Sequence, residues 1–197
     1  MKTCVFITGT NAVGKSALAW EIITRYGGVD RITNDVTYCV EGDICFAGKY
    51  GITRYGGVDR ITNDKGGSCT SRLAEVVAEG LRHADTIFCE GSYMNTFGLN
   101  LTNAMFKAER HLLVNLWADY KTIYDRVTSR SNGKNGDGKR NFHRLFTKQK
   151  QSMVAARKWQ SIGVKVLQFN TAETTIEAEV AAILQAIEEE DYSHDNK

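Results

Sequence analysis

The sequence of 197 residues contains no proline, although average usage would give roughly ten. Glycine, with 18 residues, is therefore expected to shape the loops. The five cysteines form no C-x-x-C pair, which argues against a zinc site or a disulfide framework and favours a reducing compartment. No apolar run approaches the roughly 18 residues of a membrane span, and the first residues lead directly into a strand-like segment. We therefore expect a cytoplasmic protein without a secretory signal or a membrane association.

The composition is that of a globular domain. Hydrophobic residues make up 42% of the chain and charged residues 24%, so wholesale disorder is excluded. The length fits one domain, which we place at residues 1–190. Residues 191–197 are expected to form a frayed acidic tail.

The net charge of +2 conceals an uneven distribution. Twelve Lys or Arg residues and only two acids lie between Lys121 and Lys165, whereas eight acids and no base lie between Glu173 and Asp195. A positive block in a nearly neutral protein indicates a polyanionic partner, either nucleotide phosphates or a nucleic acid backbone. A solvated helical face is the alternative interpretation.

Short apolar runs alternate with helical segments. Strands are predicted at Thr3–Thr8, Arg31–Asn34, Thr86–Cys89, His111–Trp117 and Val164–Phe169. Helices are predicted at Lys15–Tyr26, Cys69–Arg82, Tyr120–Arg130, Arg140–Gln160 and Ile176–Glu190. Residues 36–50 read as a β-hairpin within a small insertion at about 36–66. The alternation predicts an α/β fold with a mainly parallel, five-stranded sheet.

One segment of thirteen residues occurs twice. Ile23–Asp35 is identical to Ile52–Asp64, and the flanking sequences differ. Solenoid repeats show degenerate similarity over many units, so a local duplication is the simpler interpretation. The two copies are not expected to have the same role.

A glycine-rich motif carries the clearest chemistry. The segment from Gly9 to Ser16 matches G-x-x-x-x-G-K-[ST] between a predicted strand and a predicted helix. Such a loop curls its backbone N–H groups around phosphate oxygens, and the helix N-terminus adds a partial positive charge. Lys15 would bridge the β- and γ-phosphates, and the Ser16 hydroxyl would ligate Mg²⁺. The predicted nucleotide-binding residues here are Gly9, Thr10, Asn11, Ala12, Val13, Gly14, Lys15 and Ser16.

Two carboxylates are predicted at the carboxyl edge of the sheet, where ligands bind in open α/β folds. Asp35 follows the second predicted strand and Glu90 the third. A phosphotransferase needs a carboxylate to accept the proton of the acceptor hydroxyl, and often another near Mg²⁺. We expect Asp35 to be the base and Glu90 the metal-side or acceptor-side carboxylate. Asp30 is a weaker candidate base, and a turn or helix cap is the structural alternative for Asp35 and Glu90.

Arginines precede a second glycine-rich loop. Arg126 and Arg130 are four residues apart, on one helix face, and Lys139, Arg140 and Arg144 follow the loop. Two basic helices around a loop predict a lid at about 126–145 that closes over the nucleotide and neutralises the transferred charge. Asn170 and Thr171, directly after the last strand, are expected near the adenine or the first glycine loop.

These motifs together resemble the nucleoside monophosphate kinase group of P-loop kinases. The middle of the chain is similar to a narrower set, the bacteriophage 5-hydroxymethyluracil DNA kinases, which are grouped with thymidylate kinases. The segments that carry this likeness are Ala47–Tyr50, Tyr55–Asp59, Lys65–Ser68 and Phe88–Gly91. The resemblance implies transfer of the ATP γ-phosphate, with Mg²⁺, to the hydroxymethyl group of the modified base in double-stranded phage DNA, within the host cytoplasm.

The resemblance also implies an acceptor site. Its candidate residues are Asp35, Tyr50, Gly57, Asp59 and Tyr93, and a modified base in duplex DNA must be reached in a groove or flipped out. A kinase of a free nucleotide, nucleoside or small metabolite is the second hypothesis. A nucleotide-binding regulatory module without turnover is the third. The sequence leaves open whether Asp35, Asp59 or Glu90 is the base, whether ATP or GTP is used, and the oligomeric state.

Overall fold

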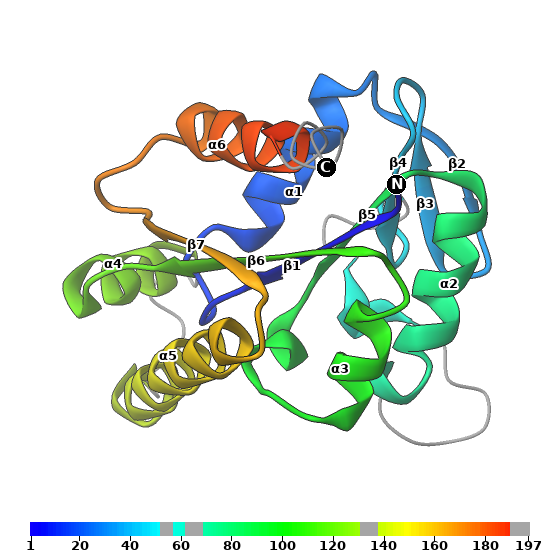
Figure 1. Cartoon of the computed structure of the whole chain (residues 1–197). Coiled ribbons are helices and arrows are strands. Elements are labelled where there is room, and N and C mark those ends of the chain that lie inside the picture. Colours follow the sequence, from blue (N-terminus) through cyan, green and yellow to red (C-terminus); the bar gives the residue numbers. More distant parts are fainter. Residues whose placement is uncertain (52–56, 62–68, 131–137, 190–197) are drawn as a thin grey trace.

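A single seven-stranded sheet forms the centre of the protein (Figure 1). The computed structural model describes residues 1–51, 57–61, 69–130 and 138–189, with only the backbone at 130 and 138–142. The strand order is β2-β3-β4-β5-β1-β6-β7. Five neighbouring strands are parallel: β4 (Ile44–Ala47), β5 (Thr86–Glu90), β1 (Thr3–Thr8), β6 (Arg110–Trp117) and β7 (Lys165–Asn170).

The sheet differs from the sequence-based prediction at one edge. β2 (Val29–Thr33) and β3 (Val36–Cys39) pair antiparallel, and β3 pairs antiparallel with β4. The predicted second strand is therefore an antiparallel edge strand. β3 and β4 form the expected hairpin, and β4 also pairs with β5 in parallel, so that the hairpin extends the main sheet. The predicted mainly parallel α/β fold is confirmed, but the sheet has seven strands rather than the predicted five, because both strands of the hairpin join it.

Two hydrophobic cores sandwich the sheet. Successive side chains of β1 alternate between the cores, as the period of a strand requires. Cys4 and Phe6 face one core, and Val5 and Ile7 the other, all fully buried. This burial on both faces explains the uninterrupted apolar run of β1.

Helices cover both faces (Figure 1). α1 (Lys15–Arg25) and α6 (Ile176–Glu189) contribute Leu18 and Ile183 to one core. α2 (Leu73–His83), α3 (Leu99–Met105) and α5 (Gly138–Ser161) contribute Leu73, Leu101 and Trp159 to the other. α4 (Tyr120–Arg130) follows β6. The short helix α3 and the 3₁₀ turns η1 (Val58–Arg60) and η3 (Ser92–Asn95) were not predicted from the sequence. The helix predicted at Cys69–Arg82 is α-helical only from Leu73, and its first residues form the 3₁₀ turn η2 (Cys69–Ser71).

Some predicted features lie outside the described residues. These are the loop of the predicted lid at 131–137, the segment Lys65–Ser68 and the acidic tail. Within the described ranges, no helix combines the length and apolar character needed to cross a bilayer.

Candidate active site

The glycine-rich loop connects β1 to α1 at the carboxyl edge of the sheet. Its backbone has positive φ at Gly9 (136°), Ala12 (66°) and Gly14 (101°). A Cβ at position 9 would lie 2.3 Å from the Leu116 carbonyl oxygen, so only glycine lets this loop pass so close to β6. The result is a concave turn that ends at a helix N-terminus, which is the backbone geometry of phosphate-binding loops.

Lys15 begins helix α1 and is buried. Its ammonium group donates to the carbonyl oxygens of Gly9 (2.8 Å) and Thr10 (2.9 Å). The side chain thus arches over its own loop, where it adds a positive charge beside the phosphate-binding N–H groups. The next hydroxyl, Ser16 Oγ, lies 3.4 Å from Glu90 Oε1.

Glu90 ends β5, the strand next to β1. The side chain is 4% exposed, and Glu90 Oε1 also accepts a hydrogen bond from the Tyr50 hydroxyl (3.0 Å). Burial raises the pKa of the Glu90 carboxyl, while the Lys15 charge and the Tyr50 hydrogen bond act in the opposite direction. Tyr50 is fully buried, so it orients Glu90 rather than offering a ring to a substrate base.

Asp59, in the 3₁₀ turn η1, supplies a second carboxylate. It is exposed, and its oxygens accept hydrogen bonds from the Ser92 backbone N–H (3.0 and 3.2 Å) and from the Ser92 hydroxyl (2.7 Å). Gly57 lets η1 approach β5, because a Cβ there would lie 2.2 Å from the Glu90 carbonyl oxygen and 2.5 Å from Glu90 Oε1.

These groups share one cleft of about 620 Å³. The glycine loop and the start of α1 form one wall, and η1 with the end of β5 forms the other. The described residues that line it include Asn11, Gly14, Lys15, Ser16, Gly57, Asp59, Arg60, Glu90 and Ser92. The cleft therefore combines the glycine loop with two cations, Lys15 and Arg60, and two carboxylates, Asp59 and Glu90.

Asp35 has a different environment from the one predicted. It lies in the tight turn between β2 and β3 with φ of 62°, because β2 is an antiparallel edge strand. Its buried carboxylate forms ion pairs with Lys49 (3.0 Å) and Arg72 (3.4 Å), and it does not line the described wall of the cleft. Two strands, β4 and β5, separate its hairpin from β1.

The remaining predicted site residues have different environments: Arg126 contacts the glycine loop, Asn170 forms a turn, and Tyr93 is exposed. Arg126 donates to the side-chain oxygen (2.8 Å) and the carbonyl (2.6 Å) of Thr171, with a longer contact of 3.5 Å to the Ala12 carbonyl. It therefore connects the end of β7 to the glycine loop. Asn170 accepts from the backbone N–H groups that follow it, as a turn residue. Tyr93 is 54% exposed outside this cleft, and the Arg130 side chain is not described.

Asn95 was missed by the sequence analysis. This buried residue of η3 accepts hydrogen bonds through Oδ1 from the Gly9 backbone N–H (2.8 Å) and from the Thr8 hydroxyl (2.9 Å). A second contact joins the loop to α5, since the Thr10 hydroxyl donates to the Leu145 carbonyl (3.1 Å). Only the folded chain brings together residues this far apart in sequence, and no motif spacing marks them.

The donor set suits Mg²⁺ bound together with phosphates. In the described part of the chain, no group of three or more His, Cys, Asp or Glu side chains could hold a metal alone. Magnesium at nucleotide sites is usually held by one or two protein oxygens plus substrate phosphates and waters. The Ser16 hydroxyl beside Glu90 provides that arrangement.

Comparisons with known proteins identify the fold. No family model matches the chain, and no curated protein matches it. The YorR protein of Bacillus subtilis, solved in complex with phosphorylated GDP, superposes with a TM-score of 0.60 at 15% identity, covering 98% of this chain and 99% of that one. This likeness concerns the fold, an α/β architecture with a mostly parallel sheet and helices on both faces.

Two further solved structures share this fold. A sugar kinase from Janibacter has a TM-score of 0.55 at 11% identity, with 95% of each chain covered. Shikimate kinase from Bacteroides thetaiotaomicron has a TM-score of 0.54 at 12% identity, with 94% of this chain and 98% of that one covered. At these identities the likeness concerns the P-loop fold and not the substrate.

Proposed function

We propose that this chain is an ATP-dependent P-loop phosphotransferase that acts on a hydroxyl group of a free nucleotide, nucleoside or small metabolite. One observation carries the proposal: the glycine loop, Lys15 and Ser16 face two carboxylates, Glu90 and Asp59, across a single cleft. A module that only binds nucleotide needs the loop but need not keep two carboxylates at its phosphate end.

The phosphate side of the cleft would bind the donor. Backbone N–H groups of the glycine loop and the Lys15 ammonium would hold the β- and γ-phosphates. Ser16, with Glu90 acting through water, would hold Mg²⁺, which supplies charge neutralisation on the phosphates. Arg126 would fix the glycine loop against Thr171, where the end of β7 and the loop meet. The acceptance of GTP in place of ATP is tested in the same assay.

Asp59 is the carboxylate that we assign to the acceptor. It lies at the exposed side of the cleft, and Ser92 fixes its orientation. Its carboxylate would accept the proton of the acceptor hydroxyl as the new O–P bond forms. The bond between the γ-phosphorus and the β–γ bridging oxygen then breaks, and ADP leaves with the electron pair.

The structural neighbours support a small acceptor. Two of them are named as a sugar kinase and a shikimate kinase, and YorR was solved with phosphorylated GDP. The cleft is also of the size, about 300–1,000 Å³, that is usual for small-molecule sites.

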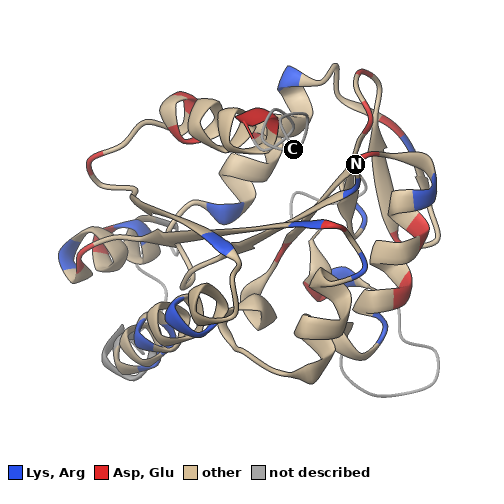
Figure 2. Cartoon of the chain, viewed as in Figure 1, with Lys and Arg blue, Asp and Glu red and all other residues tan. Residues whose placement is uncertain are grey.

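A second candidate acceptor is the hydroxymethyl group of 5-hydroxymethyluracil in phage DNA. The middle segments resemble kinases of that class, and α5 carries seven Lys or Arg residues and no acid. Figure 2 shows basic residues in blue along the part of α5 whose side chains are described. A long basic helix suits a nucleic acid backbone, so double-stranded DNA containing modified thymine is the partner that this candidate requires.

One experiment distinguishes the acceptors. The assay measures transfer of labelled γ-phosphate in the presence of Mg²⁺, with ATP and GTP as separate donors. The small acceptors are nucleosides, nucleoside monophosphates, sugars and shikimate. Duplex DNA with 5-hydroxymethyluracil and matched thymine DNA complete the panel. Label on a small acceptor supports the main proposal, and label on the modified duplex alone supports the second candidate. Equal label with the Lys15→Ala variant would overturn both, because that variant lacks the phosphate-binding ammonium.

A further inference from the structure

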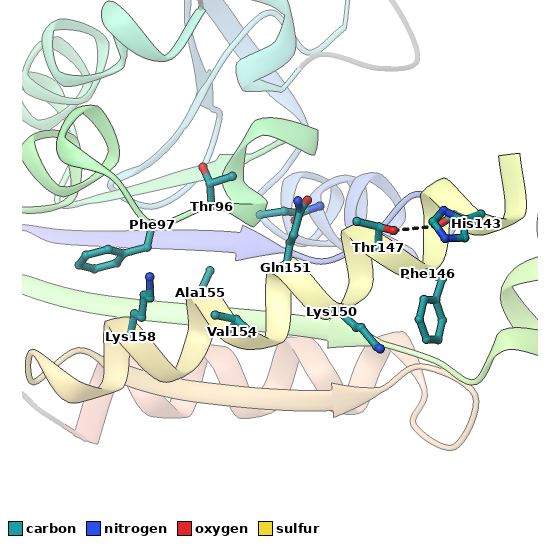
Figure 3. A pocket seen from close by; sticks show the side chains of 11 residues that line it. Thr96, Phe97, His143, Phe146, Thr147, Lys150, Gln151, Val154, Ala155 and Lys158 are labelled. Atoms are coloured by element: carbon teal, nitrogen blue, oxygen red, sulfur yellow. Dashed lines mark hydrogen bonds between the residues drawn. The ribbon is translucent and has the colours of Figure 1, made fainter. Parts of the chain in front are cut away.

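Two cavities lie on either side of the loop that follows η3. Both are separate from the cleft of about 620 Å³ that contains the glycine loop, Glu90 and Asp59, which we call the phosphate cleft. One, of about 520 Å³, lies between this loop and α5 (Figure 3). The other, of about 350 Å³, lies on the α3 side of the loop. Both are lined by Asn95, Thr96 and Gln151, and the smaller one shares Ser92 with the phosphate cleft. The three spaces are therefore neighbours around one segment, residues 92–96.

The charge along these cavities has one sign. Helix α5 presents a stripe with spacings of three and four residues, from His143 to Lys158, to the larger cavity. This stripe includes Lys150 and Lys158, and Lys148 lines the smaller cavity. No Asp or Glu is among the described residues that line either space. An anionic ligand is therefore favoured over a cationic one.

Aromatic rings accompany the lysines. Phe97 is 36% exposed and packs against the buried Trp159 with ring centroids 4.9 Å apart, which fixes its orientation. Phe146 lies under the Lys150 ammonium at 4.3 Å, and Tyr93 is half exposed at the smaller cavity. Figure 3 shows Phe97 near Lys158 at one end of the α5 stripe and Phe146 towards the other. Exposed rings between lysines suit a ligand with flat bases and phosphates.

A buried donor at the junction of the cavities also indicates a ligand. Asn95 is 2% exposed and lines both spaces, and its Nδ2 has no hydrogen-bond partner within the described chain. Its Oδ1 is held by Thr8 and Gly9, which determines the direction of the amide. Buried polar groups are nearly always hydrogen-bonded. A base carbonyl or ring nitrogen would satisfy this donor.

We propose that the two cavities form an acceptor-side site for a nucleotide unit, a planar base together with its phosphate. The base packs against the exposed aromatic rings and accepts from Asn95 Nδ2, and Lys148, Lys150 and Lys158 neutralise phosphate. The unit comes either from a free nucleotide or from a nucleic acid strand. This inference rests on the proposed phosphotransferase function, because it places the acceptor beside Ser92 and the phosphate cleft. Asn95 then connects the occupied site to Gly9 of the donor loop.

Binding tests this site without a requirement for turnover. A fluorescein-labelled single-stranded oligothymidylate of twelve nucleotides is titrated with the full chain by fluorescence anisotropy, with unlabelled dTMP and inorganic phosphate as competitors. The Lys150→Gln/Lys158→Gln double variant is expected to bind the strand at least tenfold more weakly. In a plot of log K against log salt concentration, the slope of this variant should be smaller in magnitude by about 1.4, which is about 0.7 for each lost phosphate contact. Phe97→Leu is expected to weaken binding at least about fivefold.

A matched variant controls for net charge. Arg82→Gln/Lys107→Gln removes two positive charges from exposed positions that line neither of the two cavities nor the phosphate cleft, and it should bind like the wild type. If dTMP displaces the labelled strand at concentrations where inorganic phosphate does not, the site is assigned to free nucleotides. If the strand binds and dTMP does not displace it, the site is assigned to nucleic acid. The inference is overturned if neither probe binds, or if both double variants weaken binding equally. Affinity for a fluorescent ATP analogue, measured on the same variants and on Lys15→Ala, reports separately on the donor site.

Discussion

Asp59 and Asp35 differ in what surrounds their carboxylates, and this difference separates a catalytic role from a structural one. Asp59 is exposed in the phosphate cleft, and among the described residues its carboxylate is held by Ser92. Asn at position 59 would keep an oxygen that accepts from Ser92 but could not take up a proton from an acceptor. We expect Asp59→Asn to lower turnover by about 10²–10⁴-fold, with little change in affinity for an ATP analogue. Single-turnover transfer kinetics measure this loss.

Asp35 should instead contribute to stability. Asn tolerates positive φ, so Asp35→Asn preserves the turn while removing the charge that pairs with Lys49 and Arg72. Both cations are about one-third exposed, at 38% and 30%, so water compensates them in part. We expect a loss of about 1–3 kcal/mol in the free energy of unfolding, measured by urea denaturation, with turnover within a factor of about three. A hundredfold loss of turnover without loss of stability would restore Asp35 as the base.

The ionised Glu90 carboxylate should lower the free energy of unfolding at neutral pH, while the same side chain supports activity. Its pKa is raised by burial, so the unfolded chain releases this proton at lower pH than the folded chain does. The ionised form therefore costs stability as pH rises from the unfolded value, about 4.3, through the folded pKa. We expect Glu90→Gln to be more stable than the wild type at pH 7 and equally stable below pH 4. Its Mg²⁺-dependent turnover should fall about 10–100-fold. Urea denaturation at the two pH values and transfer assays test both parts, and a variant less stable at pH 7 would contradict the first.

At the scale of elements, the duplicated segment shows what a local sequence does not determine. Val29-Asp30-Arg31 forms part of the edge strand β2, whereas the identical Val58-Asp59-Arg60 forms the 3₁₀ turn η1. Val58 is fully buried against the core, and Val29 is only partly buried. Partners distant in sequence therefore decide between the two conformations, as is usual when propensities are weak.

The glycine loop, the buried strands and the long helices were predictable because their signals are local. The apolar run of β1, the G-x-x-x-x-G-K-S motif and the boundaries of α4 are all as predicted. The antiparallel direction of β2 was not predictable, because the sequence Arg31–Asn34 carries no information on which strand it pairs with. That error placed Asp35 beside the phosphates in the prediction.

At the scale of the whole molecule, the donor site should couple to stability. A ligand that binds only the folded state stabilises it by about 2.7 kcal/mol at a hundred times its Kd. For a chain of this size that corresponds to a rise in Tm of about 5–11 °C. We expect Mg²⁺-ATP to give such a shift in differential scanning fluorimetry, and Lys15→Ala to lose most of it. An undiminished shift in the variant would indicate that the nucleotide binds elsewhere.

The most direct test compares the two aspartates in one transfer assay. Wild type, Asp59→Asn and Asp35→Asn are each incubated with Mg²⁺, γ-labelled ATP and the pooled acceptors, and labelled product is quantified. The account predicts product from the wild type and from Asp35→Asn, and at least a hundredfold less from Asp59→Asn. Full product from Asp59→Asn, or none from a folded wild type with any acceptor, would contradict it.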